Sequence, residues 1–388
     1  MLNNACRGAW VRSSALLTAV LAAAVVSVGT AQAQGTGAYP DAEGARCADV
    51  PYGGFRPAEP GRAPSLGDAV YVTPPNPAGP TVVDIGLSVF EITDVDLDYN
   101  TFSMEAFLDL LWCDPRLAAE ATEAMPTRFF LEHDAQLALD QIWWPDIEIV
   151  NETRRREIEH EQLVIHPDGT VIYRERFNAT MAARYDLRAF PFDTQILEVE
   201  MRSLAFARDV VIFHEAAAIG FSTDFHLPEW TISGLDTRVE ARQLARDTAP
   251  FSEFLAEITV VRDPGFYVTR VIVPLTVIIL LATIVYWMDG KALGERVRVS
   301  FTGLLTAVAY QFTTADALPQ HVYNSYLDAV VALSLVVMVF SIVESLVVSR
   351  YVRDGRQAIA VRVDVTARWM VPGAYLAGLA ALFFVYTA

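Results

Sequence analysis

The spacing of hydrophobic and polar positions divides this chain into two regions. From Thr81 onward, apolar and polar residues alternate in many short segments, whereas long apolar runs take over after residue 265. Alternation with a period of two is typical of β-strands with one buried face, and a run of about 20 apolar residues is long enough to cross a membrane as a helix. The sequence therefore predicts an all-β domain over residues 81–264 and a transmembrane domain over residues 265–388.

The alternation in the first region indicates an antiparallel β-sandwich. It is clearest at residues 83–89, 102–112, 197–202 and 254–260, where every second residue is apolar. Turn residues, such as the His-Pro-Asp-Gly segment at 166–169, separate such stretches, and no long helical pattern interrupts them. Many short strands joined by turns favour a sandwich.

The second region contains four predicted membrane spans, at residues 266–288, 297–315, 326–349 and 369–387. The second of them carries polar side chains at regular intervals. Spacings of four and three residues place five of its side chains on one stripe of an α-helix: Arg298, Thr302, Leu305, Ala309 and Phe312. A polar stripe cannot face lipid, so the pattern is typical of a pore-lining helix. The alternative is a bundle helix whose threonines bond to their own backbone carbonyls.

Charged residues at the ends of the spans indicate the orientation, because cytoplasmic connections are enriched in lysine and arginine. The connections between spans one and two and between spans three and four carry these residues, and the connection between spans two and three does not. Residues 1–33 are typical of a signal peptide, and a Pro/Gly-rich tail or linker follows over 34–80. We expect a multi-pass protein of the bacterial inner membrane whose N-terminal domain and C-terminus are periplasmic or extracellular.

Composition narrows the class of protein. The 388 residues are 53% hydrophobic and carry a formal net charge of −18, which favours a membrane protein with an acidic soluble part. No GxSxG, HExxH, P-loop or CxxC motif occurs, so neither an enzyme nor a cofactor, a metal or a nucleic-acid partner is expected. A membrane-anchored periplasmic sensor or enzyme domain is the alternative of another class. Cys47 and Cys113 remain after signal cleavage in an oxidising compartment, but sequence cannot show whether they are close enough to pair.

Several motifs carry a resemblance to a known family. In chain order they are Trp112-Cys113-Asp114-Pro115-Arg116-Leu117, Trp143-Trp144-Pro145-Asp146, Phe190-Pro191-Phe192-Asp193, Arg262 and Leu318-Pro319. This ordered set resembles the pentameric ligand-gated ion channels, the Cys-loop receptor superfamily, and the second span is most similar to the ELIC type of pore helix. The name-giving cysteines are replaced by Ala183 and Leu197, as in the prokaryotic branch of ELIC- and GLIC-type channels.

The resemblance implies an architecture and a set of partners. It implies an extracellular immunoglobulin-like sandwich followed by a four-helix transmembrane bundle, assembled with four identical subunits into a homopentamer around a central pore. The implied partners are membrane lipid, a small extracellular ligand and permeant inorganic ions. No cofactor is implied.

Candidate ligand-binding residues lie on two predicted strands, except Phe206, which lies two residues after Leu204, where many members of the family have an aromatic residue. Aromatic rings among carboxylates suit a cation, with ordinary subunit-interface packing as the alternative. The resemblance matches Phe107 and Phe251 to aromatic positions on opposite sides of a pocket between subunits. The candidates are Glu105, Phe107, Asp109, Phe206, Phe251 and Glu253. A small primary amine is the expected ligand, and an orphan or proton-gated channel of the same fold is the alternative.

The pore and its coupling to the sandwich complete the expectations. Leu305 and Phe312 are candidate gates that close by dewetting. The resemblance implies cation conduction from glutamate at position 295, and Arg298 leaves an anion channel as the alternative unless Glu295 neutralises it. The resemblance assigns coupling to the domain boundary, where Arg262 pairs with Asp193 or Asp96. The coupling candidates are Asp96, Asp98, Phe190, Pro191, Phe192, Asp193, Arg262, Leu318 and Pro319.

Overall fold

A computed structural model describes most of the chain from residue 73 onward. The described residues are 47, 73–118, 127–216, 220–221, 227, 229–244, 249–314 and 324–387. The predicted signal peptide, nearly all of the 34–72 stretch and the Leu318-Pro319 pair lie outside them.

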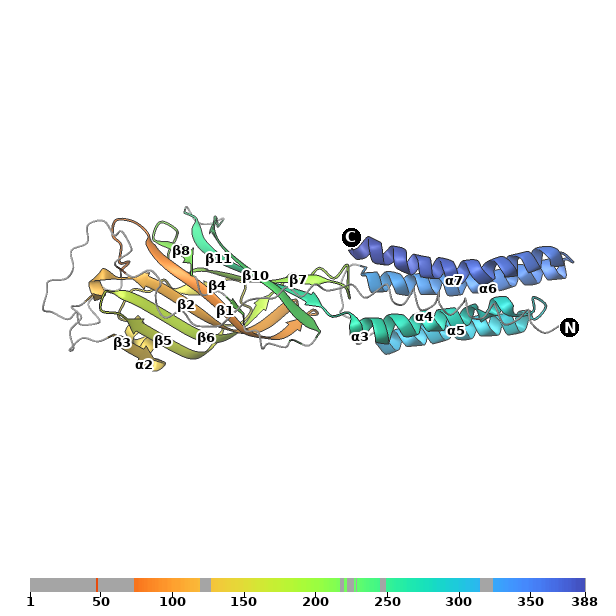
Figure 1. The fold of residues 1–388 in the computed structure, drawn as a ribbon, viewed down its shortest axis with the longest axis horizontal. Coiled ribbons are helices and arrows are strands. Elements are labelled where there is room, and N and C mark those ends of the chain that lie inside the picture. The colour runs from red at the N-terminus through yellow and green to blue at the C-terminus, as the bar shows by residue number, and fades with distance from the viewer. Residues whose placement is uncertain are drawn as a thin grey trace, which may run out of the picture. The chain divides into compact units, whose positions relative to one another are not determined.

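The first region is a sandwich of two β-sheets, as the alternation predicts (Figure 1). One sheet has the order β3-β5-β6-β2-β1-β8, with β9 also beside β1, and the other has the order β10-β11-β7-β4. The pairs are antiparallel except for β8 and β9, which run parallel to β1. The strands are β1 Thr81–Asp96, β2 Thr101–Cys113, β3 Arg128–Leu131, β4 Ile147–Ile149, β5 Glu157–Ile165, β6 Thr170–Ala182, β7 Thr194–Ser203, β8 Val211–Glu215, β9 Gly220–Phe221, β10 Trp230–Arg242 and β11 Phe251–Arg262.

The apolar faces of the two sheets form the core of the sandwich. On β7, Leu197, Val199 and Met201 are fully buried while Glu198 between them is exposed. A side-chain period of two therefore decides which residues enter the core. A short helix, α2 (His133–Leu139), adds two buried alanines and a leucine to the same cluster.

The predicted turn at 166–169 joins β5 to β6 and depends on its glycine. Gly169 has a φ of +92°, a conformation that residues with a Cβ rarely adopt. A Cβ there would also lie 2.6 Å from the carbonyl oxygen of Asp114. The close approach allows the Asp114 amide to donate to the Gly169 carbonyl at 2.9 Å.

A disulfide joins Cys47 to Cys113 at the end of β2, which resolves the pairing that the sequence left open. Their Cα atoms are 5.2 Å apart and the two residues are separated by 66 positions. The Cys47 amide also donates to the Thr170 hydroxyl at 3.1 Å. Closing so long a loop restricts the unfolded chain and so stabilises the folded one.

The second region is helical. α3 (Gly265–Tyr267), a π-helical turn (Val268–Ile272), α4 (Val273–Ala282) and a 3₁₀ turn (Thr283–Trp287) follow one another without a break, and α5 (Leu293–Thr314), α6 (Tyr326–Arg353) and α7 (Gln357–Thr387) come next (Figure 1). In the described part, three segments are long and apolar enough to cross a membrane: Gly265–Trp287, Tyr326–Arg353 and Gln357–Thr387. The sequence placed the fourth span at 369–387, but its helix begins at Gln357, because helical structure continues past the apolar run into the polar residues before it.

Close packing joins α5 to its neighbours. At Gly303 an added Cβ would lie 2.6 Å from Met338 Cε of α6 and 2.9 Å from Ala282 Cβ of α4. The absence of a side chain at this position therefore lets three helices approach one another.

A buried ion-pair cluster links α5, α6 and α7. Arg296 of α5 is fully buried and donates to Glu344 of α6 at 2.8 Å and to Asp364 of α7 at 2.7 Å. The sequence offered Arg296 only as a marker of a cytoplasmic connection. The cluster makes it a structural residue instead, because a buried guanidinium requires anionic partners.

Candidate ligand site, coupling contacts and pore helix

The carboxylates predicted for ligand binding on β2 already have partners within the chain. Glu105 forms an ion pair with Arg176, and Asp109 forms one with Arg174. Both arginines come from β6, where Arg176 lies directly opposite Phe107 and Arg174 directly opposite Asp109. The negative charge expected on this face is therefore largely compensated by two arginines that the sequence analysis did not include.

The Arg176 guanidinium also occupies the cation–π position over Phe107. Its central carbon lies 5.7 Å from the centre of the Phe107 ring and 4.9 Å from the centre of the Phe90 ring, and its Nε is 3.3 Å from Glu159. The pattern that suits a cationic ligand is thus present, but an arginine of the same chain is the cation. The sequence signal for it is the period-two spacing of Arg174 and Arg176 on β6.

The other candidates lie on or near the second sheet. Phe251 has the Arg202 guanidinium 6.0 Å from its ring centre, and Arg202 pairs with Glu148 at 2.7 Å. Glu253 is only 2% exposed, and burial raises the pKa of its carboxyl. Phe206 packs against Trp143 with ring centres 5.6 Å apart, so its ring belongs to the core packing.

A buried cluster of two glutamates and a tyrosine lies on the paired strands β5 and β6 of the first sheet. The Tyr173 hydroxyl is 2.7 Å from Glu161 Oε1 and also 2.7 Å from Glu175 Oε2. Glu161 and Glu175 are 4% and 1% exposed. Arg156 donates to the other oxygen of Glu175 at 2.7 Å. Burial, followed by the charge of Glu175, raises the pKa of Tyr173, so its hydroxyl keeps its proton.

The Tyr173 hydroxyl faces two carboxylates but has one hydrogen to donate. One hydroxyl supplies one hydrogen, so Tyr173 can donate to only one of the two carboxylates. The two glutamates therefore compete for the single hydroxyl hydrogen of Tyr173. Glu161 Oε2 is also buried without a hydrogen-bond partner, which is costly for a polar atom.

The proposed coupling residue Arg262 is buried at the end of β11 and pairs with Asp193. The two side chains are each 1% exposed and form a two-pronged contact, with Nε to Oδ1 at 2.8 Å and Nη2 to Oδ2 at 3.2 Å. Trp230 and Phe190 cover the guanidinium, with ring centres 3.9 Å and 4.9 Å away. Of the two predicted partners, the structure therefore selects Asp193.

Asp96 and Asp98 belong to the turn between β1 and β2. Asp96 Oδ1 accepts hydrogen bonds from the backbone amides of Asp98 and Tyr99, both at 3.0 Å. Asp96 therefore stabilises the turn itself rather than Arg262, and its expected alternative pairing is wrong in this structure.

The Phe190–Asp193 turn, which includes Pro191, contacts three helices. Phe190 packs on Tyr267 of α3 with ring centres 4.7 Å apart, and Phe192 packs on Tyr326 of α6 at 5.6 Å and on Phe383 of α7 at 5.0 Å. The Tyr326 amide also donates to the Arg188 carbonyl at 2.9 Å. The turn is therefore in direct contact with the ends of these helices.

The predicted stripe of α5 is the face that the other helices leave uncovered. Leu305 and Phe312 are 64% and 77% exposed. The remaining members are exposed as well: Glu295, Arg298, Thr302 and Ala309. Arg296, Ser300 and Ala307 on the opposite face are buried. A stripe found by spacing alone is thus free to face either water or another subunit.

Two further contacts on α5 concern choices that the sequence left open: cation or anion conduction, and a pore-lining helix or a bundle helix. Arg298 lies 3.3 Å from Glu295, so the neutralising i,i+3 pair is present. Thr306 and Thr313 donate to the carbonyls of Thr302 and Ala309 at 2.8 Å and 2.9 Å. Threonines bonded to the backbone of their own helix are therefore found on the same helix as the exposed stripe. The pore-lining and bundle-helix interpretations do not exclude each other.

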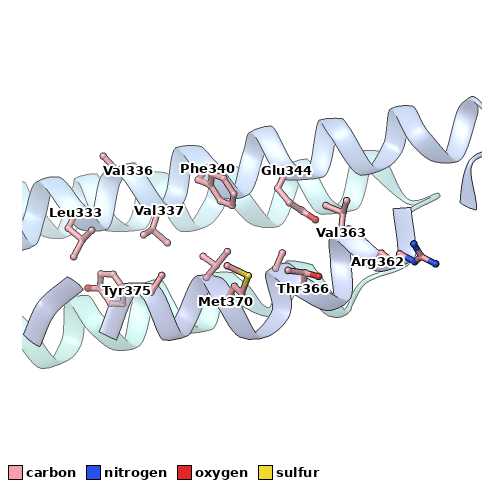
Figure 2. Close-up of a pocket in the computed structure, with 13 residues that line it drawn as sticks. Leu333, Val336, Val337, Phe340, Glu344, Arg362, Val363, Thr366, Met370 and Tyr375 are labelled. Atoms are coloured by element: carbon pink, nitrogen blue, oxygen red, sulfur yellow. The ribbon is translucent and has the colours of Figure 1, made fainter. Parts of the chain in front are cut away.

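A groove between α6 and α7 is separate from all of these candidates. Its volume is about 600 Å³, and its walls are mostly apolar, with residues such as Leu333, Phe340 and Tyr375. The charged residues Glu344 and Arg362 lie toward one end of the groove (Figure 2). None of the predicted ligand, pore or coupling residues lines it.

Two family models match the chain. The model of the neurotransmitter-gated ion-channel ligand-binding domain matches residues 69–262, which is half of the chain. The model of the neurotransmitter-gated ion-channel transmembrane region matches residues 271–370. The first match covers the sandwich, and the second covers α4 to α6 and the first part of α7.

Individual proteins are similar along much of the chain. A proton-gated ion channel of Gloeobacter violaceus is 27% identical over 323 residues, covering 82% of this chain and 87% of that protein. The gamma-aminobutyric acid receptor subunit beta-4 of Gallus gallus is 26% identical over 263 residues, covering 64% of this chain, and the chain spans only 51% of that subunit. Together with the two model matches, these similarities rule out the alternative of a membrane-anchored enzyme. The chain belongs to the neurotransmitter-gated ion-channel family, as a ligand-gated channel subunit of the prokaryotic branch of the Cys-loop receptors.

Proposed function

We propose that five copies of this chain form a homopentamer whose central pore is lined by α5 as a fourth membrane span. The observation that carries the proposal is the stripe from Glu295 to Phe312, which is exposed in the single chain although the opposite face of α5 is buried. In a hydrocarbon environment a stripe with charged and hydroxyl side chains requires water or a polar partner. The inner membrane of a bacterium, with the sandwich and the C-terminus outside, is the location that the flanking charges support.

Oligomeric state and current test this function together. Purified protein should elute as a pentamer in detergent and should carry current in planar bilayers when the correct ligand or pH is supplied. A stable monomer or dimer would contradict the pore model. A verified pentamer that stays silent under every condition would contradict the channel activity itself.

We further propose that the pore prefers cations. Glu295 lies at the start of α5 and is paired with Arg298. In the proposed pentamer, five copies of Arg298 would form a ring of positive charge around the pore, and the paired glutamates reduce that charge. The net charge of −18 also favours accumulation of cations near the outer domain.

Reversal potentials under asymmetric salt measure this preference. Wild-type protein should reverse near the cation equilibrium potential, Glu295→Gln should move the reversal toward the anion side, and Arg298→Gln should move it further to the cation side. A wild-type reversal at the anion potential would show that Arg298 dominates.

The ligand is proposed to be a small primary amine bound at the interface between sandwiches, close to Phe107 and Phe251. A carboxylate suits the ammonium group, and Glu105 lies on this surface, where an amine has to compete with its partner Arg176. Because Arg176 already lies over Phe107, the same surface also suits a carboxylate on the ligand, as in gamma-aminobutyric acid, the compound that names the similar receptor subunit of Gallus gallus.

Three ligands of similar length separate the contribution of the amine from that of the carboxylate. Propylamine carries only the amine, butyrate only the carboxylate, and gamma-aminobutyric acid both. Current with propylamine supports the amine site alone, and current restricted to gamma-aminobutyric acid supports both contacts. If Arg176→Gln then weakens gamma-aminobutyric acid but not propylamine, the carboxylate contact is assigned to Arg176. Activation by butyrate alone would overturn the amine proposal.

A second candidate function is proton sensitivity, favoured by the buried cluster around Tyr173. Two buried glutamates share one tyrosine hydroxyl there, and Glu161 Oε2 has no hydrogen-bond partner. Further charged groups lie next to it: Glu152 interacts with Glu175, Arg156 and Arg155, and Asp146 interacts with Arg156. Burial raises the pKa of Glu152, so this carboxyl takes up a proton at a higher pH than an ordinary glutamate as the solution is acidified.

Replacing Glu161 with glutamine should reduce the pH dependence of the current. The amide keeps the size of the side chain but its charge cannot change with pH, so the current–pH curve should become shallower if the cluster senses protons. Glu157→Gln on the same strand is the control, since Glu157 is exposed. Identical curves for wild type and Glu161→Gln would remove this cluster as a proton sensor.

A further inference from the structure

The first membrane segment contains a proline that leaves one backbone carbonyl without its helical donor. In an α-helix the amide of residue 274 would donate to the carbonyl of residue 270, but Pro274 has no N–H. Just before it the helix widens into a π-helical turn, in which the Val273 amide donates to the Val268 carbonyl. The Arg270 carbonyl therefore requires a donor from outside its own α-helical pattern, because an unpaired carbonyl in the membrane is costly.

Tyr310 of α5 supplies that donor. Its hydroxyl donates to the Arg270 carbonyl oxygen, and its half-buried ring packs against the apolar cluster that α4, α6 and α7 share. Tyr310 directly follows Ala309 and lies two residues before Phe312, both members of the exposed stripe. One hydrogen bond thus connects the proposed pore helix to the point where the first segment is interrupted.

We propose that Tyr310 is a positioning residue for gating, because its hydrogen bond to the carbonyl freed by Pro274 holds α5 in one of the two conformations of the pore. The inference rests on the proposed function of α5 as the pore helix. A contact shifts a two-state equilibrium only if it differs between the states. A hydroxyl that must reach a single carbonyl meets this condition, because a tilt or rotation of α5 moves the ring away from the first segment.

The direct test is a double-mutant cycle on the full-length pentamer. Tyr310→Phe removes the hydroxyl and keeps the ring, and it should shift the activator concentration for half-maximal current at least fivefold. Pro274→Ala restores an N–H that can donate to the Arg270 carbonyl. In the Pro274→Ala background, Tyr310→Phe should therefore change the midpoint less than twofold. The activator is an acidic pH step or propylamine, whichever evokes current from the wild type.

A matched control separates this role from general packing. Tyr286→Phe also removes an interhelical tyrosine hydroxyl, which bonds to Ser341 at 2.7 Å, but it touches no carbonyl freed by a proline. Its effect should be the same in the wild-type background and in the Pro274→Ala background. If Tyr310→Phe leaves the midpoint unchanged, or if its effect is equally large in both backgrounds, the proposal is overturned.

Fluorinated tyrosines at position 310 provide a test that keeps Pro274 in place. Ring fluorination makes the hydroxyl a stronger donor with little change of shape, so the midpoint should move in the direction opposite to that of Tyr310→Phe, and further with each added fluorine. A midpoint that ignores fluorination would also overturn the proposal. Silent wild-type pentamers would instead contradict the channel function, so the two failures are distinguishable.

Discussion

Arg262→Ala is expected to abolish agonist-evoked current while leaving assembled protein. The Arg262–Asp193 pair is 1% exposed on both sides, and removing one partner leaves a buried carboxylate without compensation. Loss of one member of such a pair costs about 3–5 kcal/mol, which is large compared with the free-energy difference between two channel states. The aromatic rings of Phe190 and Trp230 around the guanidinium lose their partner as well. Whole-cell or bilayer current at saturating activator, measured on protein verified as a pentamer, checks this prediction.

The control for Arg262→Ala is an arginine on the neighbouring strand. Arg238 of β10 pairs with Glu257 at 2.6 Å, but its side chain is 48% exposed. Arg238→Ala should therefore leave the current and the midpoint nearly unchanged, because solvent screens an exposed pair. Asp193→Asn should reproduce most of the Arg262 defect, since it removes the charge from the same contact. Normal current from Arg262→Ala would show that this contact does not couple the sandwich to the pore.

Leu305→Thr is expected to produce channels that conduct without activator. Leu305 is 64% exposed on the proposed pore stripe, and a narrow apolar ring closes a pore because water leaves it. A hydroxyl at this ring keeps the constriction wet, so the closed state loses stability relative to the open one. The midpoint should fall at least tenfold, about 1.4 kcal/mol in the gating equilibrium, and resting leak should appear. Phe312→Ala should act in the same direction through a wider ring.

A residue on another face of α5 tests whether the effect belongs to the stripe. Phe301 is 51% exposed in the single chain but is not on the stripe. Phe301→Ala should therefore produce no resting leak. If Phe301→Ala leaks as strongly as Leu305→Thr, then α5 presents a different face to the pore and the assignment of the stripe is wrong.

Local patterns were sufficient for the architecture of the chain. Period two on β7 correctly predicted that Leu197, Val199 and Met201 enter the core, because the pleat of a strand alternates its side chains whatever the partner strand is. The length of the apolar runs likewise predicted three membrane-spanning helices, and the four-and-three spacing on α5 selected the face that the structure leaves exposed.

The sequence could not predict which charged residues pair with each other. Arg262 pairs with Asp193, 69 positions away, rather than with Asp96, and the candidates Glu105 and Asp109 are paired with arginines of β6. Each of these contacts depends on strand register, and every polar residue on a face is a plausible partner until the register is known.

The sequence by itself determined the two-region plan, the buried faces of the strands and the exposed stripe of α5, because these follow from side-chain periodicity and apolar length along one segment. Only the tertiary structure decided the Cys47–Cys113 disulfide, the buried Arg296 cluster and the bond from Tyr310 to the Arg270 carbonyl. The physical reason is that these contacts join segments tens of residues apart, and their distances are set by how sheets and helices pack rather than by any local preference.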